Sequence, residues 1–334
     1  MLRDGLRRRR GAAQCPAALI PGAHPDALLD TRLDTLRGAL LGALLDALLG
    51  SNAVLAVTVT DDTGKAITLP QPARRIVSLA PHVTELIYAA GAGGQLVGAI
   101  EYSDYPEAAK KVPRVGSARG IDLERIATLK PDLVIAWQTG NAAVQVERIE
   151  ALRIPVYRSE PRKVDDVATS LTRIGVLTGH EREAERAAAD FRGRVARLAQ
   201  TYAKKAPVRV FYQVWSNPVI TVGGTHLISD VMRLCGAENI FSASTTPAPT
   251  VGIESVLAGA PQMIIVGRSP GAPNGDQDMN LWKQWPEMPA VKNKRIVAID
   301  PDLITRHTPR IVTGAEQLCK AVDQARATAP AAKP

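Results

Sequence analysis

The sequence predicts an α/β fold of two Rossmann-like lobes with mostly parallel sheets, joined by a long rigid helix. The first observation is an internal repeat, in which residues 123–136 read LERIATLKPDLVIA and residues 253–266 read IESVLAGAPQMIIV. The second is the alternation of short apolar runs with helical patterns around each copy, which is typical of parallel sheets. The third is residues 181–204, where helical spacing continues for about 35 Å at 1.5 Å per residue.

Each copy of the repeat reads as a short helix, a proline turn and a buried strand. Glu124 and Glu254 fall at the helix start, where a carboxylate meets the positive end of the helix dipole. Pro131 and Pro261 end the helix, because proline lacks an N–H and disfavours helical geometry in the preceding residue. The apolar runs that follow suit strands buried on both faces.

The expected elements of the first lobe start with a hairpin over residues 57–70. A buried strand at 74–80 leads to a helix that Pro81 opens and Gly91 ends. A strand at 96–100, a loop at 101–120, the first repeat copy and a further helix and strand complete this lobe.

Two helices, with a break at Gly179, fill residues 164–205, and the second is expected to span between the lobes. The second lobe then begins with a strand at 208–214 and a helix at 227–237. It continues with the second repeat copy, a strand at 295–299 and a final helix at 309–325. We therefore expect domains at 57–163 and 207–325, connecting helices at 164–206 and a tail at 326–334.

Residues 1–56 read as a leader and signal peptide. A basic flank precedes the apolar run LRGALLGALLDALLG, and short or small residues lead to a cleavage point near Ala56. A transmembrane anchor is the alternative, although Asp46 interrupts the run and the run is short for a span. The 35 residues ahead of the run are long for a leader, which suggests a start codon assigned too early.

Charge and cysteine content fit an exported protein. The formal charge of +8 is spread along the chain, and no interleaving of basic and aromatic residues indicates a nucleic-acid surface. Cys15 falls in the leader, which leaves Cys235 and Cys319 as a pair. An oxidising compartment favours a bridge between them, and two buried free thiols are the alternative.

The sequence gives no support for catalysis. It contains no G-x-S-x-G elbow, P-loop or H-E-x-x-H motif. His82 and Glu85 share a helix face, but two candidates do not make a metal site, and we expect surface or capping roles for them.

The residues that stand out are placed to hold a ligand. Tyr102, Tyr105, Trp137 and Trp215 all fall just beyond expected strand ends, as does the segment 302–310. Open α/β sheets bind ligands at the carboxyl ends of their strands. Rings and polar groups on both lobes would suit a large, mostly apolar ligand.

Six stretches carry a resemblance to a known family; they are RIVSLAPHVTELIYAAG, YSDYP, IDLERIATLKPDLVIAW, RLCGAENIF, IESVLAGAPQ and RHTPRI. Over residues 74–325 the chain resembles the periplasmic cobalamin-binding proteins of ABC importers, in the helical-backbone class of substrate-binding proteins. The resemblance implies a monomeric, non-catalytic periplasmic protein, without a cofactor or metal of its own, that carries cobalamin or a related corrinoid to a permease dimer in the inner membrane.

The resemblance also implies roles for individual residues. The ligand contacts would be Tyr102, Trp137, Trp215, Asp302, Leu303, Ile304, Thr305 and Arg306. Glu124 and Glu254 would dock onto permease arginines, one from each lobe. Cys235 and Cys319 match a disulfide of the cobalamin-binding relatives.

Two positions depart from the family pattern. The chain has Ala118 and Ala248 where the well-known cobalamin binders carry tryptophans before the two glutamates. Each lost ring removes a stacking surface worth on the order of 1–2 kcal/mol, for which Trp215 is a candidate replacement. The ligand could therefore be a corrinoid that lacks its lower base, and the alternative function is binding of haem or an iron-siderophore.

Overall fold

The structure is a computed structural model that describes residues 56–117, 120–268 and 275–327. The expected leader, apart from Ala56, and the departure at Ala118 lie outside these residues.

The first lobe contains a four-stranded parallel sheet in the order β4-β3-β7-β8. Its strands are β3 (Ile76–Ser78), β4 (Leu96–Ala99), β7 (Leu133–Trp137) and β8 (Val156–Ser159). Its helices are α2 (Pro81–Ala89), α3 (Leu123–Leu129) and α4 (Ala143–Ala151), and the hairpin expected at 57–70 is β1 (Val57–Thr60) with β2 (Ala66–Leu69). Gly91, with a φ of 91°, follows α2 as expected.

The second lobe repeats this strand order. Its sheet, also parallel, runs β12-β9-β13-β14. The strands are β9 (Val208–Gln213), β12 (Ala237–Asn239), β13 (Met263–Gly267) and β14 (Ile296–Ile299), and the helices beside them are α7 (Leu227–Leu234), α8 (Ile253–Ala258) and α10 (Pro289–Lys292). In chain order, each sheet is arranged second, first, third, fourth. The repeat therefore supplies the helix and third strand of each lobe, which confirms the predicted duplicated α/β architecture.

Alternating strand residues build different cores on the two faces of each sheet. Ile135 of β7 and Ile265 of β13 face one large cluster, which includes residues of both lobes. Val134 of β7 packs instead beneath α3 and α4, and Ile264 of β13 packs in a cluster with Val256 of α8. Consequently α3 and α8 cover equivalent sheet faces, away from the shared core.

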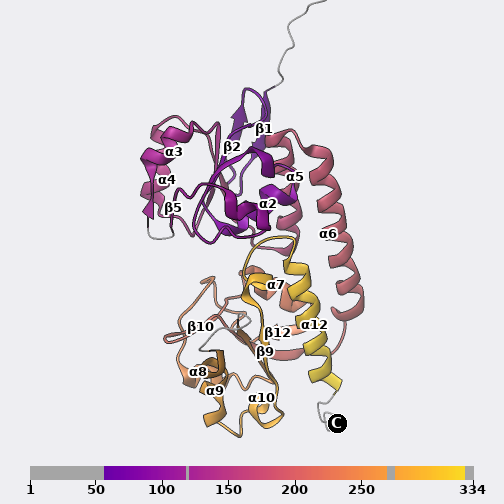
Figure 1. Cartoon of the computed structure of the whole chain (residues 1–334). Helices are drawn as coiled ribbons and strands as arrows, with labels where there is room; N and C mark the ends of the chain where they lie inside the picture. The colour runs from indigo at the N-terminus through magenta and orange to yellow at the C-terminus, as the bar shows by residue number, and fades with distance from the viewer. Residues whose placement is uncertain (1–55, 118–119, 269–274, 328–334) are drawn as a thin grey trace, which may run out of the picture. The chain divides into compact units, whose positions relative to one another are not determined.

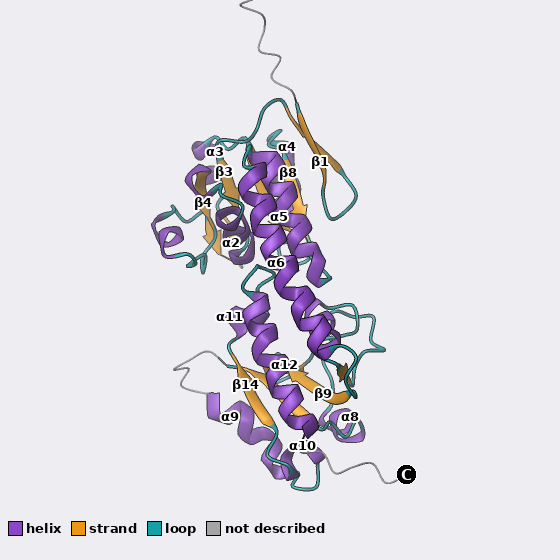
Figure 2. Cartoon of the chain, turned by 90° about the vertical axis from the view of Figure 1, so that its right-hand side faces the viewer, coloured by secondary structure: helices purple, strands orange, loops and turns teal. Residues whose placement is uncertain are grey.

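The connecting helices are α5 (Val164–Thr178) and α6 (Glu181–Tyr202). Gly179 ends α5 with a φ of 74°, a left-handed conformation that glycine adopts without strain, so the predicted break is confirmed. Figures 1 and 2 show α6 beside α5 and α12 (Ile311–Ala327), and α6 contacts both helices. A helix of 22 residues is thus packed against the other connecting helix and against α7 and α12 of the second lobe.

A disulfide joins Cys235 and Cys319, as favoured from the sequence. Cys235 follows the last residue of α7, and Cys319 lies within α12, where both are fully buried. The bridge closes a span of 84 residues, and closing a long loop stabilises a fold mainly by restricting the unfolded chain.

Several short elements of the structure have no counterpart among the predicted ones. They are η1 (Gly93–Gln95), η2 (Glu107–Lys111), β5 (Gly116–Ser117), β6 (Gly120–Ile121), β10 (Trp215–Ser216), β11 (Val219–Ile220), α9 (Gly275–Asn280), η3 (Leu281–Gln284) and α11 (Pro301–Ile304), together with β12 and α10. Each of them spans only two to six residues, too few to establish a period. The domain boundaries given above stay a prediction.

Candidate ligand-binding site

A buried carboxylate on α2 receives two arginines from the second lobe. Arg310 donates through Nε to Glu85 Oε2 at 2.9 Å and through Nη2 to Oε1 at 2.6 Å. Arg306 donates through Nη1 to the same Oε1 at 2.9 Å. The side chain of Glu85 is only 2% exposed. Charge-assisted, bidentate bonds of this kind offset the cost of burying a carboxylate.

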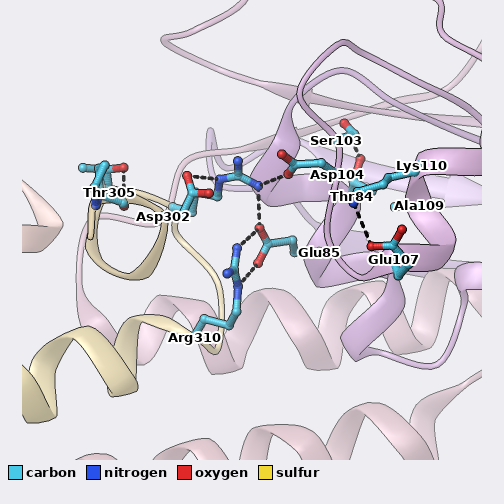
Figure 3. Close-up of polar contacts among 12 residues, drawn as sticks. Thr84, Glu85, Ser103, Asp104, Glu107, Ala109, Lys110, Asp302, Thr305 and Arg310 are labelled. Atoms are coloured by element: carbon cyan, nitrogen blue, oxygen red, sulfur yellow. Dashed lines mark hydrogen bonds and ion pairs between the residues drawn. The ribbon is translucent and has the colours of Figure 1, made fainter. Parts of the chain in front are cut away.

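Arg306 also binds two aspartates at the edge of this group, Asp104 and Asp302, which Figure 3 labels together with Glu85 and Arg310. Its Nη1 donates to Asp104 Oδ1 at 2.8 Å, and its Nε lies 3.0 Å from Asp302 Oδ1. We call Glu85, Asp104, Asp302, Arg306 and Arg310 the arginine cluster. Because its members come from both lobes, it joins them through ion pairs.

The cluster changes the proton affinities of its members. Burial raises the pKa of Asp104, but the hydrogen bond and charge of Arg306 lower it by more, so the net pKa falls. Burial lowers the pKa of Arg306, but its bonds to Asp104 and Glu85 raise that pKa by more, so the net pKa rises. The pKa of Arg310 also rises, since bonding to Glu85 outweighs burial. These charged forms are therefore stabilised by one another.

Two tyrosines lie close to the cluster in the sequence. Tyr102 is 73% exposed and has a φ of 62°, a conformation that is rare for a bulky side chain. Such a residue is held in place by its surroundings, which is frequent at ligand sites. Tyr105 stacks against Arg310, with the guanidinium carbon 3.9 Å from the ring centroid.

Beside the cluster lies a pocket of about 290 Å³. Its lining includes Glu85, Tyr88 and Tyr105 from the first lobe and Pro309 and Arg310 from the second. Both lobes therefore contribute to a hollow at this place.

Trp137, half-buried at the end of β7, belongs to a group of rings in which His82 and His307 are buried and His226 is half-buried. His82 lies 5.2 Å from Trp137 and 5.4 Å from His307 between centroids, and His226 lies 5.9 Å from His307. His82 Nε2, His307 Nδ1 and Trp137 Nε1 are buried and have no hydrogen-bond partner within the described residues. We call His82, Trp137, His226 and His307 the ring group.

Burial keeps the three histidines neutral. It lowers the pKa of His82 to about 3, with a further contribution from Arg306, and that of His226 to about 4. Burial and the two other histidines lower the pKa of His307 well below its usual value. His226 also caps α7, because its Nδ1 accepts a hydrogen bond from the backbone N–H of Ile228 at 3.1 Å.

The expectation of surface or capping roles for His82 and Glu85 is wrong. Both are buried, and the N-cap of α2 makes no side-chain hydrogen bond. The partners of Glu85 follow it by 221 and 225 residues, so nothing local in the sequence identifies them. The only sequence signal is the spacing of Arg306 and Arg310, four residues apart.

The other residues expected at the site differ in their surroundings. Trp215 is 62% exposed on β10, and its Nε1 donates to the carbonyl of Asn217 at 3.0 Å. Leu303 and Thr305 are half-buried, and Thr305 Oγ1 donates to the Pro301 carbonyl. Ile304 is fully buried in the core, so in this structure its side chain supports the segment from beneath.

Glu124 and Glu254 occupy equivalent positions. Each is the second residue of its helix and is exposed, and the described contacts give neither an ion pair. Asp122 caps α3 by accepting a hydrogen bond from the Arg125 N–H at 2.9 Å, whereas Gly252 precedes α8. Neither glutamate is therefore needed as the helix cap.

The described residues offer neither a metal site nor a membrane span. They contain no group of three or more histidine, cysteine or acidic side chains that could hold a metal ion. Among the same residues, no helix is both long and apolar enough to span a membrane.

Comparison with known proteins gives consistent matches. The model of the periplasmic binding protein family matches residues 76–303. The chain is 39% identical over 267 residues to the vitamin B12-binding protein of Vibrio cholerae serotype O1, covering 80% of this chain and 95% of that one. The solved structure of the periplasmic vitamin B12 binding protein BtuF of Vibrio cholerae superimposes with a TM-score of 0.71 at 39% identity, over 76% of this chain and 98% of that chain. The periplasmic haem-binding protein RhuT of Roseiflexus, at 24% identity, TM-score 0.65 and coverages of 75% and 98%, shares the fold.

Proposed function

Because the chain belongs to the periplasmic binding protein family, we propose that it captures cobalamin or a related corrinoid between its lobes and delivers it to an ABC importer permease. The protein is periplasmic, and its family is one of binding proteins rather than enzymes. The corrinoid is the transported ligand, and no cofactor or catalysis is part of the proposal.

One observation carries the proposal. The 39% identity to a vitamin B12-binding protein extends over 95% of that relative, so it includes both lobes and the segments between them. A likeness confined to one sheet would support only a common fold.

We assign the contacts with the corrinoid to residues from both lobes. They are Tyr102 and Trp137 from the first lobe, and Trp215, Asp302, Leu303, Thr305 and Arg306 from the second, with Ile304 fixing the last group from the core. The exposure of Tyr102 and Trp215 supports this assignment, since rings left in water gain most from covering a large ligand. The ion pairs of Arg306 support it too, because they hold the guanidinium in one orientation.

The partner in this proposal is a permease dimer in the inner membrane, and the binding protein acts as a monomer. Glu124 and Glu254 would contact basic residues of the permease. Their exposure, their equivalent positions in the two lobes and their lack of a described ion pair support this role.

The test is a side-by-side titration of the purified mature protein with cyanocobalamin, cobinamide and haem. We expect saturable one-to-one binding of at least one corrinoid, seen by calorimetry and by the visible spectrum of the ligand. Binding of haem or a ferric siderophore without binding of either corrinoid would establish the alternative carrier function instead.

A further inference from the structure

The positive charges of the arginine cluster are already neutralised before any ligand binds. Arg306 contacts three carboxylates, those of Glu85, Asp104 and Asp302. Arg310 binds both oxygens of Glu85 and is covered on one face by the ring of Tyr105. Three carboxylates against two guanidinium groups leave the cluster with one net negative charge.

The groups that a ligand would meet are the acidic ones. The side chains of Asp104 and Asp302 are 44% and 45% exposed, whereas those of Arg306 and Arg310 are 13% and 22% exposed. The cluster therefore presents carboxylate oxygens to the solvent and keeps its guanidinium groups beneath them.

One neighbouring side chain adds a positive charge: Arg114 donates to the backbone carbonyls of Ser103 at 2.8 Å and Ala109 at 3.2 Å, beneath the segment that carries Asp104. The other neighbouring groups add little. Burial lowers the pKa of His82, His226 and His307, so these three side chains are neutral at pH 7. Lys110 interacts electrostatically with Asp104, but its ammonium group is paired with Glu107 at 2.7 Å (Figure 3). Glu101, beside Tyr102, is a further exposed acid.

One edge of Arg306 remains for a neutral acceptor. Its described bonds and ion pairs use Nε and Nη1, so the Nη2 group is left to donate. An amide oxygen can accept from Nη2, and an amide N–H can donate to Asp104 or Asp302. A carboxylate can accept from Nη2 but would lie against two like charges, which is costly in a partly desolvated site.

We propose that the arginine cluster selects a neutral ligand that offers amide groups and rejects one that offers carboxylates at this place. This rests on the proposed function and refines it, because the side chains of an amidated corrinoid are amides whereas haem carries two carboxylates. Asp104 and Asp302 are the specificity-determining residues, and Glu85 positions Arg306 between them.

The test compares ligands that differ only in this chemistry. Cyanocobalamin and its monocarboxylic acids, in which one side-chain amide is replaced by a carboxylate, are titrated into the protein at pH 7.5 and low ionic strength. We expect at least one monocarboxylic acid to bind about 10-fold or more weakly than cyanocobalamin, because like charges would be brought together. Haem, with two carboxylates, is expected to bind more weakly than cyanocobalamin.

Variants then identify the charges responsible. In Asp104→Asn with Asp302→Asn, the affinity for that monocarboxylic acid should approach the affinity for cyanocobalamin. The matched control is Glu185→Gln with Asp190→Asn on α6, which removes the same charge from an exposed helix face and should leave the difference intact. Circular dichroism and thermal unfolding check that each variant is folded.

The outcomes separate the two proposals. Tight binding of every monocarboxylic acid, or a difference that the Asp104→Asn, Asp302→Asn variant retains, overturns the selectivity while corrinoid binding stands. Binding of haem without any corrinoid overturns both, since the favoured ligand would then be a dicarboxylate.

Discussion

Tyr102 shows how a single residue can indicate a site. A tyrosine that is 73% exposed and also has a positive φ gains little from packing, and its backbone conformation is unfavourable. The neighbouring segment, held by the bond from Arg306 to Asp104, fixes it there. A ring kept in this position is suited to cover a flat ligand.

We therefore expect Tyr102→Ala to weaken corrinoid binding by about 5- to 30-fold, the equivalent of about 1–2 kcal/mol for a lost stacking surface. Because the ring is exposed, the midpoint of thermal unfolding should change little. Calorimetric titration of wild type, Tyr102→Ala and Tyr102→Phe measures the effect, with the Phe variant retaining most of the affinity. Equal affinity in all three would remove Tyr102 from the contact surface.

At the scale of elements, the N-terminal part of α2 meets the segment between α11 and α12 through the ring group. His82 comes from α2, and His307 follows α11 by three residues. Both are buried, and Arg306 and His226 are the charged or titratable groups that act on them besides each other. This junction is thus built from neutral imidazoles.

The buried histidines should make the folded state sensitive to acid. The pKa of His82 is about 3 in the folded protein against 6.5 in an exposed chain, so between these values the unfolded state binds a proton that the folded state does not. The contribution of neutral His82 to the free energy of unfolding is therefore complete above pH 6.5, and it declines as the pH falls below that value. Each such histidine adds a slope of about 1 kcal/mol per pH unit near pH 5.5.

We expect the free energy of unfolding in urea to fall between pH 6 and pH 5 in the wild type, and to fall by about 1 kcal/mol less in His82→Phe. Phenylalanine keeps a ring at this position but takes up no proton. Comparison of the two slopes, rather than of the absolute stabilities, removes the contribution of carboxylates that both proteins share. Identical slopes would show that His82 is accessible to protons in the folded protein.

The sequence predicts features that depend on neighbouring residues better than features that depend on residues far apart in the chain. The repeat, the break at Gly179 and the hairpin at 57–70 are local patterns, and each was predicted correctly. The bond of Glu85 to Arg306 joins residues 221 positions apart, and it exists only once the two lobes are folded. A buried glutamate on a helix reads, in sequence alone, like an exposed one.

The contacts among the expected site residues were predictable only in part, for the same reason. Asp302 and Arg306 meet each other four residues apart within one segment, as their spacing allows. Their contacts with Asp104 and Glu85 could not be foreseen, since a period of 3.6 residues says nothing about a partner in the other lobe. Trp137 was expected near the ligand, but its histidine neighbours were not.

At the scale of the whole molecule, the two lobes have the same strand order and share one large core cluster. Their junction also contains the arginine cluster and the helices α5, α6 and α12. We expect this rigid connection to keep the lobes nearly fixed when a ligand binds. Such a molecule would present Glu124 and Glu254 to the permease at a constant separation.

Replacing both glutamates, as Glu124→Ala with Glu254→Ala, should leave corrinoid affinity unchanged and weaken capture by the cognate permease, because exposed charges act mainly on partner recognition. A pull-down with detergent-solubilised permease compares this variant with Glu185→Ala, Asp190→Ala, which loses the same charge from α6. Undiminished capture of the double glutamate variant would refute the docking role.

We infer that a corrinoid lies between the lobes, against Tyr102 on one side and beside Arg306 on the other. The most direct test is a crystal structure of the protein with cyanocobalamin bound. We expect the corrin ring in contact with Tyr102 and at least one side-chain amide of the ligand within hydrogen-bond distance of Arg306, Asp104 or Asp302. A corrinoid bound on one lobe alone, away from these residues, would contradict it.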